Sequence, residues 1–124
     1  MQTMDNHTKY AAGMQGQEAA EAFLAQKGMR ILTRNYRIRT GEIDIIASDG
    51  TYLVFIEVKT RKSKNYGPGR ESVTPHKQSR IIRTAMHYIT RYNQHNRDMR
   101  FDVVEVTAGR EGIHIAHIEN AFWA

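Results

Sequence analysis

The sequence contains no cysteine, and the marks of several other protein classes are missing from its 124 residues. Without cysteine there is no disulfide framework and no thiolate chemistry. No apolar run approaches the roughly 20 residues that cross a bilayer, and the N-terminus lacks the basic-then-apolar pattern of a secretory signal. The six histidines do not pair at ligand spacing, which argues against zinc. We therefore expect a soluble, cytoplasmic protein.

Acidic residues are scarce in one part of the chain. The formal net charge is +5, yet residues 60–100 carry ten Lys or Arg and two acids, whereas the remainder carries eight Lys or Arg and eleven acids. A localised basic segment indicates a polyanionic ligand, most simply nucleic acid. A solvated, solubilising surface explains the same pattern equally well, so charge alone leaves both explanations open.

The chain length and a hydrophobic share of 40% fit one packed domain. We expect residues 1–13, which are polar and without periodicity, to form a flexible N-terminal tail, and residues 14–124 to form the domain. Helices are predicted at residues 15–27 and 75–93, and strands at 29–39, on both sides of a turn within 40–61, at 101–106 and at 113–118. This order predicts an α/β protein in which helices pack on a sheet that begins as an antiparallel meander. In the final residues, Phe122 and Trp123 are expected to cap an apolar surface.

Residues 40–61 have the pattern of two strands joined by a tight turn at Asp49-Gly50. The second arm, Tyr52–Val58, is apolar and β-branched enough to be a strand buried on both faces. Nevertheless, it ends in Glu57 and continues to Lys59. Charges at the end of a buried strand are costly unless they are paired or bind a metal.

Asp44, Glu57 and Lys59 are expected to converge. The turn places Asp44 across from the Glu57 region, and side chains alternate along a strand, so Glu57 and Lys59 share a face. Two carboxylates suit Mg²⁺ or Mn²⁺, and a lysine beside them can stabilise charge during phosphodiester hydrolysis. A cross-strand salt bridge within the same three residues is the structural alternative. We expect Glu42 to point away from Asp44 and to be a weaker ligand.

A basic loop at residues 60–73 leads into the second predicted helix, for which Thr74 is the N-cap and Pro75 the first residue. The apolar stripe of this helix is Ile81, Ile82, Ala85, Ile89 and Tyr92. A second, basic stripe consists of His76, Arg80, Arg83, His87 and Arg91. Across the chain, the candidate nucleic-acid contacts are Arg37, Arg61, Lys62, Lys64, Arg70, Lys77, Arg80 and Arg83.

Asp44 followed by Glu57-Val58-Lys59 resembles the signature of the PD-(D/E)xK nuclease superfamily, in an α-β-β-β-α-β order like the core of that superfamily. Over most of its length the chain also resembles the bacterial YraN-like family, which is similar in pattern to the archaeal Holliday-junction resolvases. The matching blocks are Gly16-Gln17-Glu18, Asn35-Tyr36-Arg37, Gly41-Glu42-Ile43-Asp44, Val54–Arg61 and Lys77. Ile43 stands where the superfamily's name has proline, a departure that many members share.

The resemblance implies a restriction-endonuclease-like fold, with a mixed central sheet flanked by helices, and a site for Mg²⁺ or Mn²⁺. By position, Asp44 and Glu57 would be metal ligands together with the Val58 carbonyl, and Lys59 would be the catalytic lysine. Glu18 matches the first-helix acid that resolvase-like members add to the site, although the helical pattern alone predicts that it faces solvent. Resolvase-like relatives work as dimers, so the resemblance also implies a homodimer.

Three hypotheses of function remain. A metal-dependent endonuclease acting on DNA, branched or otherwise structured, would use both the acid and lysine set and the basic surface. A non-catalytic nucleic-acid-binding protein on the same scaffold would use the basic surface alone. A structural or interaction protein would use the acids and the lysine as paired charges. We favour the endonuclease, because a buried strand ending in charges lies next to the basic segment.

Overall fold

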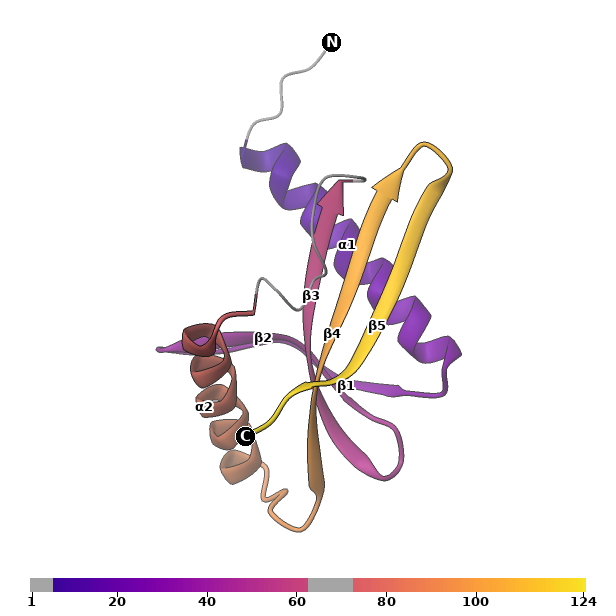
Figure 1. The fold of residues 1–124 in the computed structure, drawn as a ribbon. Helices are drawn as coiled ribbons and strands as arrows, with labels where there is room; N and C mark the ends of the chain where they lie inside the picture. The colour runs from indigo at the N-terminus through magenta and orange to yellow at the C-terminus, as the bar shows by residue number, and fades with distance from the viewer. Residues whose placement is uncertain (1–5, 63–72) are drawn as a thin grey trace.

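The protein folds as two helices packed on one five-stranded sheet (Figure 1). The computed structural model describes residues 6–62 and 73–124, and for residues 6–14 and 62 it describes the backbone alone. In chain order the elements are α1 (Asn6–Gln26), β1 (Arg30–Ile38), β2 (Gly41–Ser48), β3 (Tyr52–Lys62), α2 (Pro75–Arg91), β4 (Asp98–Gly109) and β5 (Gly112–Phe122). The predicted order of helices and strands is confirmed. Of these helices, neither is long and apolar enough to cross a bilayer.

The sheet is mixed. Its spatial order is β1-β2-β3-β4-β5, and the pairs β1–β2, β2–β3 and β4–β5 are antiparallel. β3 and β4 pair in parallel, from Tyr52 opposite Asp98 to Lys62 opposite Ala108. A parallel pair needs a crossover connection, and α2 lies in that connection. The predicted meander of the first three strands and the predicted mixed sheet are therefore confirmed.

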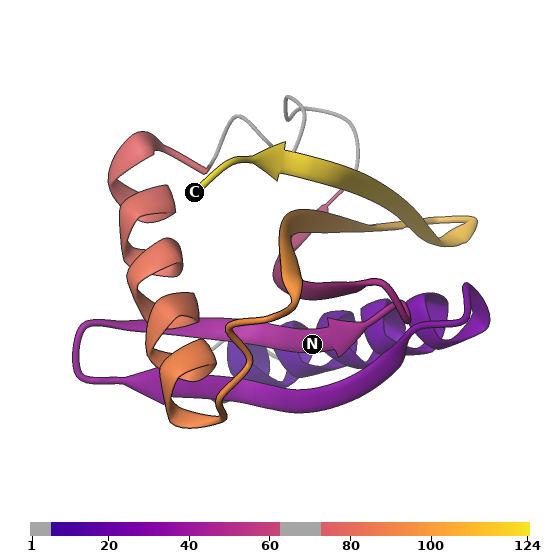
Figure 2. The ribbon, with the colours of Figure 1, turned by 90° about the horizontal axis from the view of Figure 1, so that it is seen from below.

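Each face of the sheet carries one helix (Figures 1 and 2). On the α1 face, Ala20 and Leu24 of α1 belong to one buried cluster with Val54 and Ile56 of β3. On the α2 face, the buried side of α2 packs in a second cluster that contains Phe55. Successive side chains of β3 alternate between the two faces, so this strand is covered on both sides as predicted.

Helix α1 is longer than the sequence predicts. It begins at Asn6 rather than Gln15, so residues 6–13, expected in a flexible tail, are helical, and the tail residues 1–5 lie outside the described part. The additional segment contains no proline, and extending an existing helix costs far less than starting one. The predicted end is confirmed, because Gly28 follows the helix with a φ of 93°.

Helix α2 begins as predicted, with the Thr74 side chain as its cap and Pro75 as its first residue. Its buried residues are Ile81, Thr84, Ala85, Tyr88 and Ile89. The prediction missed Thr84 and Tyr88 because both carry a hydroxyl group. It was wrong for Tyr92, which is 46% exposed.

Two contacts tie α2 to the hairpin between β1 and β2. Arg80 Nε donates to the Thr40 carbonyl at 3.1 Å. Gly41 approaches α2 so closely that a Cβ atom at this position would meet the Thr84 hydroxyl. That hydroxyl is itself satisfied, because it donates to the Arg80 carbonyl at 2.8 Å. The beginning of β2 is therefore held against the middle of α2.

Strand β5 continues to Phe122, four residues beyond the predicted end at Ile118. Phe122 is buried and stacks on Phe101 of β4, with ring centroids 5.1 Å apart. Trp123, which was expected to cap the same apolar surface, is 74% exposed, so the prediction is correct for Phe122 and wrong for Trp123. An aromatic pair in the core thus anchors the end of the sheet.

A buried network of charged side chains joins β4, β5 and the turn after β2, and the sequence analysis did not find it. Arg100 donates to Asp102 from Nε at 3.0 Å and to Asp49 from Nη1 at 3.0 Å. His117 Nε2 lies 2.7 Å from Asp102 Oδ2. Burial alone would raise the pKa of Asp102, but hydrogen bonds with His117 and Arg100 hold it below its ordinary value. Asp102 is therefore an ionised, fully paired carboxylate inside the protein.

Replacing Asp102 by alanine should lower the free energy of unfolding by about 3–5 kcal/mol, because the buried Arg100 guanidinium loses its main partner. Urea titration at neutral pH, followed by circular dichroism, measures this loss. Glu119→Ala is the matched control, since Glu119 lies 3.6 Å from the same guanidinium but its side chain is 53% exposed. The control should change the free energy by less than about 1 kcal/mol. An equal loss of unfolding free energy in Asp102→Ala and Glu119→Ala would show that burial of the carboxylate does not determine its contribution.

Candidate active site

Strands β2 and β3 separate where the predicted carboxylates lie. In Figure 1, β1 and β2 run across the view whereas β3, β4 and β5 run upright, because the sheet is strongly twisted. The ladder between β2 and β3 ends with Ile45 opposite Ile56. Beyond this pair, Asp44 Oδ2 accepts a hydrogen bond from the Val58 amide at 2.8 Å. A side chain thus bridges the two strands and fixes the Asp44 carboxylate beside the charged end of β3.

Strand β2 changes face at Asp44. Ile43 belongs to the buried cluster on the α2 face, whereas Ile45 belongs to the cluster on the α1 face. Residues two apart on a regular strand share a face, so the backbone turns between Ile43 and Ile45. Asp44 lies at this turn, which allows its side chain to reach toward β3 rather than stand straight out from β2.

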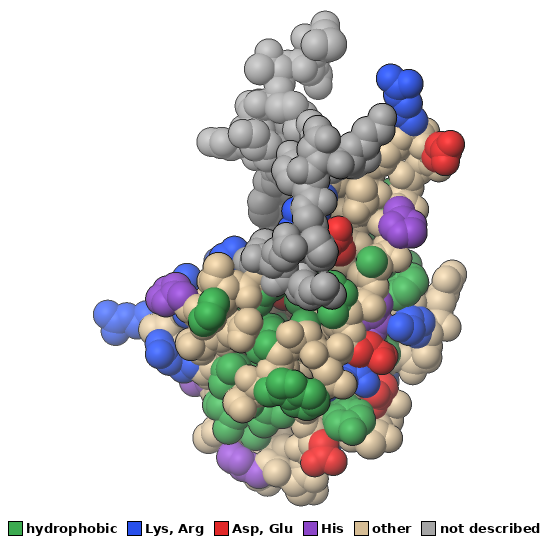
Figure 3. Space-filling view, viewed as in Figure 1, with side chains coloured by type: hydrophobic (Ala, Val, Ile, Leu, Met, Phe, Trp, Pro, Cys, Tyr) green, Lys and Arg blue, Asp and Glu red, His purple; other side chains and the backbone are tan. Residues whose placement is uncertain are grey.

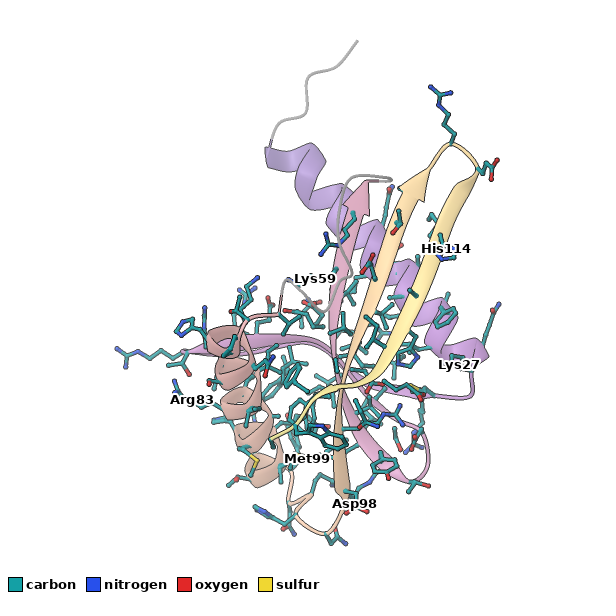
Figure 4. All side chains as sticks on the ribbon, viewed as in Figure 1. Lys27, Lys59, Arg83, Asp98, Met99 and His114 are labelled. Carbon is teal, nitrogen blue, oxygen red and sulfur yellow. The ribbon has the colours of Figure 1, made fainter. Side chains whose placement is uncertain are left out.

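Asp44 and Glu57 line one pocket of about 190 Å³. The lining residues are Gly41, Glu42, Asp44, Glu57, Lys77, Arg80 and Ile81. Lys59 lies two residues beyond Glu57 on β3, on the side toward α2 (Figure 4), and its Nζ is 3.9 Å from Glu57 Oε2. The expected convergence of Asp44, Glu57 and Lys59 is therefore what the fold produces, and α2 adds Lys77 and Arg80 to the same place.

The two carboxyl groups of the pocket cannot both ionise easily. Burial, the hydrogen bond with Asp44 and the charge of Asp44 raise the pKa of Glu57 to about 8. The charges of Lys59 and Lys77 act in the opposite direction and offset only part of this rise. Without a cation, Glu57 is therefore protonated at neutral pH. The charges of the two lysines do not overcome the rise in its pKa, which weakens the salt-bridge explanation of these residues.

Lys59 is also affected by its surroundings. Burial lowers the pKa of Lys59, and the neighbouring Lys77 lowers it further, whereas the negative charge of Glu57 acts to raise it. The net result is a pKa below the ordinary value for lysine. Lys59 is therefore better able to exchange a proton near neutral pH than a lysine on the protein surface.

The donor set fits a small divalent cation. Asp44 and Glu57 present hard oxygen atoms in one pocket, and their mutual repulsion is what a cation would relieve. Among the described residues, no group of three or more His, Cys, Asp or Glu could hold a metal ion. Val58 lies between Glu57 and Lys59 with its amide on Asp44, and the ligand role of its carbonyl stays a prediction.

The expected direction of the Glu42 side chain is wrong, whereas its weaker ligand role stays a prediction. Glu42 lines the same pocket as Asp44 instead of pointing away from it, as residues two apart on one strand are able to do. Its Oε2 accepts from Arg37 Nη2 at 2.9 Å, so this carboxylate already has a cationic partner. Arg37, a candidate nucleic-acid contact, is therefore also the counter-ion of an acid on the pocket wall.

Glu18 does not line the pocket of Asp44 and Glu57. It is exposed on α1, which covers the opposite face of the sheet, and the helical pattern had indicated a solvent-facing side chain. Its neighbour Gln17 is the buried residue, and Gln17 makes the hydrogen bond to the β2 backbone at Asp44. The catalytic role of Glu18 stays a prediction. Sequence reasoning missed Gln17, whose only signal was its place in the Gly16-Gln17-Glu18 block.

The basic candidates that the structure describes lie mainly around α2 and the neighbouring hairpin. Lys and Arg side chains gather on this side of the molecule in Figure 3, and Arg83 points outward from α2 in Figure 4. Arg61 lies on β3, with Nε 3.9 Å from Glu105 Oε2. Lys62 is described by its backbone only, and Lys64 and Arg70 lie outside the described residues. The pocket is thus flanked by cations that arise from two different elements.

Replacing Glu57 by glutamine should stabilise the metal-free protein above neutral pH. The pKa of Glu57 is raised on folding, so its contribution to stability is present below about 4.5 and is lost as pH rises toward about 8. Glutamine cannot ionise. Because one pKa unit corresponds to about 1.4 kcal/mol, the difference in unfolding free energy should move in favour of the variant by about 5 kcal/mol over this range.

Urea titrations in a chelating buffer at several pH values measure this difference. Glu119→Gln removes an exposed carboxyl on β5 and controls for the loss of one charge. A difference between wild type and Glu57→Gln that does not change with pH would contradict the mutual repulsion of Asp44 and Glu57 in the pocket.

Comparison with known proteins places the chain in a family. The family model described as "Uncharacterised protein family UPF0102" matches residues 16–106, which include Asp44, Glu57, Lys59 and α2. A UPF0102 protein of Symbiobacterium thermophilum is 49% identical, over 90% of this chain and 96% of its own length. A UPF0102 protein of Chlorobium phaeobacteroides is 50% identical, over 89% of this chain and 92% of its own length. A UPF0102 protein of Geobacter sulfurreducens is 42% identical, over 94% of this chain and 92% of its own length. The chain therefore belongs to the UPF0102, or YraN-like, family.

Proposed function

We propose that this protein is a Mg²⁺- or Mn²⁺-dependent endonuclease of the PD-(D/E)xK superfamily that hydrolyses phosphodiesters in DNA, with branched or otherwise structured DNA as its substrate. The observation that carries the proposal is the pair of carboxyl groups, Asp44 and Glu57, in one pocket with lysine and arginine side chains. Two carboxylates beside cations favour a ligand that brings both a metal ion and phosphate groups.

Asp44 and Glu57 would hold the cation, with the Val58 carbonyl as a further oxygen ligand. A bound Mg²⁺ or Mn²⁺ would supply Lewis acidity, which activates water and polarises the phosphodiester. The Val58 amide orients the Asp44 carboxylate at 2.8 Å, so this ligand is in place before the cation enters. Since burial and Asp44 raise the pKa of Glu57 to about 8, Glu57 would give up its proton on becoming a metal ligand.

Lys59 would act on the reacting phosphate. Its ammonium group is 3.9 Å from a Glu57 oxygen, which keeps it at the edge of the ligand set. An ammonium group held there would stabilise the negative charge that develops on phosphate oxygens during hydrolysis. This effect is stronger in a half-buried site than in water. The lowered pKa of Lys59 also suits a group that gives or takes a proton during the reaction.

The cations around α2 would bind the DNA backbone. Lys77 and Arg80 lie on the pocket wall, and Arg83 is exposed on the same helix. Cations arranged in this way would contact the phosphates that neighbour the reacting phosphate along one DNA strand. A homodimer would let two pockets act on the two related strands of a branched substrate. The matching location for such an enzyme is the cytoplasm, where bacterial DNA is found.

Incubation with four-way junction, flap, linear duplex and single-stranded DNA in Mg²⁺ or Mn²⁺ tests the proposal. We expect metal-dependent cleavage that falls by about a hundredfold to a thousandfold in Lys59→Met, because the charge on phosphate loses its stabilising cation. Asp44→Asn should abolish cleavage, and Glu119→Gln, far from the pocket, should leave it intact.

Cleavage that survives in Asp44→Asn would disprove the proposed site. DNA binding without cleavage under any of these conditions would favour the alternative, a non-catalytic nucleic-acid-binding protein. No binding of Mg²⁺, Mn²⁺ or DNA would favour paired structural charges.

Replacing Arg83 by glutamine should weaken DNA binding and flatten its salt dependence. Each lost phosphate contact lowers the slope of log affinity against log salt by about 0.9 for duplex DNA. Fluorescence anisotropy with labelled duplex at several salt concentrations measures the slope. Arg110→Gln removes the same charge from the turn between β4 and β5 and is the matched control. Equal effects of the two substitutions would show that net charge, rather than the α2 surface, determines binding.

A further inference from the structure

We propose that Gln17 is a positioning residue for Asp44: together with Asn35, it holds the β2 backbone from the α1 face, so that the Asp44 carboxylate stays on the Val58 amide on the other face. The inference rests on the proposed function only in the use that it assigns to Asp44. The contacts themselves involve neither metal nor substrate.

Gln17 and Asn35 form a reciprocal amide pair. Gln17 Nε2 donates to Asn35 Oδ1 at 2.9 Å, and Asn35 Nδ2 donates back to Gln17 Oε1 at 3.2 Å. Gln17 Nε2 also donates to the Asp44 carbonyl at 3.4 Å. Gln17 is 6% exposed, so its polar atoms have little water to replace these partners. One side chain therefore links α1, β1 and β2.

The pair sits where both strands depart from regular geometry. In the β1–β2 ladder, Arg34 pairs with Ile45 and Tyr36 with Ile43, which places Asn35 opposite Asp44. Asn35 has a φ of 52°, in the left-handed region that asparagine tolerates better than most residues.

At the same register, β2 turns between Ile43 and Ile45. This turn directs the Asp44 carboxylate toward β3. Gln17 hydrogen-bonds both to Asp44 at the turn and to Asn35 on the neighbouring strand. Fixing these two residues therefore fixes the direction in which the Asp44 side chain leaves the strand.

Helix α1 lies close enough to the sheet for the Gln17 side chain to reach Asp44 and Asn35. Gly16 packs against Thr60 of β3 so tightly that a Cβ atom at this position would meet the Thr60 hydroxyl. A larger residue would push the beginning of the packed part of α1 away from the sheet. Thr60 and Val58 point to the α1 face, whereas Glu57 and Lys59 point to the α2 face. The helix therefore supports the pocket from behind without entering it.

A ligand-supporting role differs measurably from ordinary helix packing. Removing a group that orients a metal ligand typically costs about tenfold to a hundredfold in metal affinity. Helix packing alone predicts a loss of overall stability with the site unchanged in those molecules that remain folded. The hydrogen bond from Val58 to Asp44 reports directly on the site, because its amide can be followed in the metal-free protein.

Gln17→Met is the primary variant, because methionine keeps the length and helix propensity of glutamine and removes its hydrogen bonds. Asn35→Gly removes the partner amide and keeps the positive φ accessible. Ala20→Gly is the matched control: it weakens α1 at another buried position on the same face without touching Asn35 or Asp44. All are compared by hydrogen exchange of individual amides and by calorimetric titration with Mn²⁺.

In Gln17→Met and Asn35→Gly, we expect exchange of the Val58 amide to speed up by about tenfold or more relative to the amides of β4, and Mn²⁺ affinity to fall by about tenfold to a hundredfold. The double variant should lose no more than Gln17→Met alone, because the two side chains act as one unit. Ala20→Gly should change the hydrogen-exchange protection of the Val58 amide and of the β4 amides to the same extent.

Unchanged protection of Val58 in Gln17→Met, or a change shared equally with β4, would overturn the inference. If the wild-type protein binds no Mn²⁺, the proposed function fails, and the Val58 measurement still decides the role of Gln17. If Mn²⁺ binds and Val58 keeps its protection in the variant, the inference alone fails.

Discussion

The hydrogen bond between the Asp44 carboxylate and the Val58 amide is the contact on which the candidate site depends. It lies where the twist of the sheet ends the regular ladder between β2 and β3. A backbone amide left without a partner at this junction would be costly, so the side chain serves the fold as well as the pocket. The bond also keeps Asp44 beside Glu57 in spite of their repulsion, which the raised pKa of Glu57 reflects. Folding therefore maintains an electrostatically unfavourable pair in a fixed geometry.

The two faces of the sheet have different tasks. On the α1 face, packing around Ala20 and Leu24 is apolar, and the buried Gln17 makes a polar contact with Asn35. On the α2 face, an aromatic core that includes Phe55 gives way to charged side chains as β3 continues to Glu57 and Lys59. The same strand therefore serves as core at its centre and as a wall of the site at its end. Changes to the site can thus be separated from changes to the main core.

Much of the site could be predicted because it depends on local rules. The Asp49-Gly50 turn sets the register of β2 and β3, alternation places Glu57 and Lys59 on one face, and Thr74-Pro75 marks the beginning of α2. The partner of Gln17, and Asp49 and His117 in the Arg100–Asp102 network, could not be found in this way, because they come from other strands or turns, whose pairing is not encoded in any single segment. Glu42 lines the same pocket as Asp44 because residues two apart on a strand can share a face. The longer α1 shows that an absence of periodicity does not exclude a helix.

The raised pKa of Glu57 has a consequence for the order in which the proposed ligands would bind. Without a cation, Glu57 is protonated at neutral pH and adds no negative charge to a pocket wall that carries Lys77 and Arg80. A divalent cation that displaced this proton would make the pocket more positive. Under the proposed function, a phosphate group would therefore be attracted in both states, and assembly of the ternary complex would begin with either the nucleic acid or the metal ion. Such random-order assembly would let the protein remain on DNA while the cation exchanges with solution.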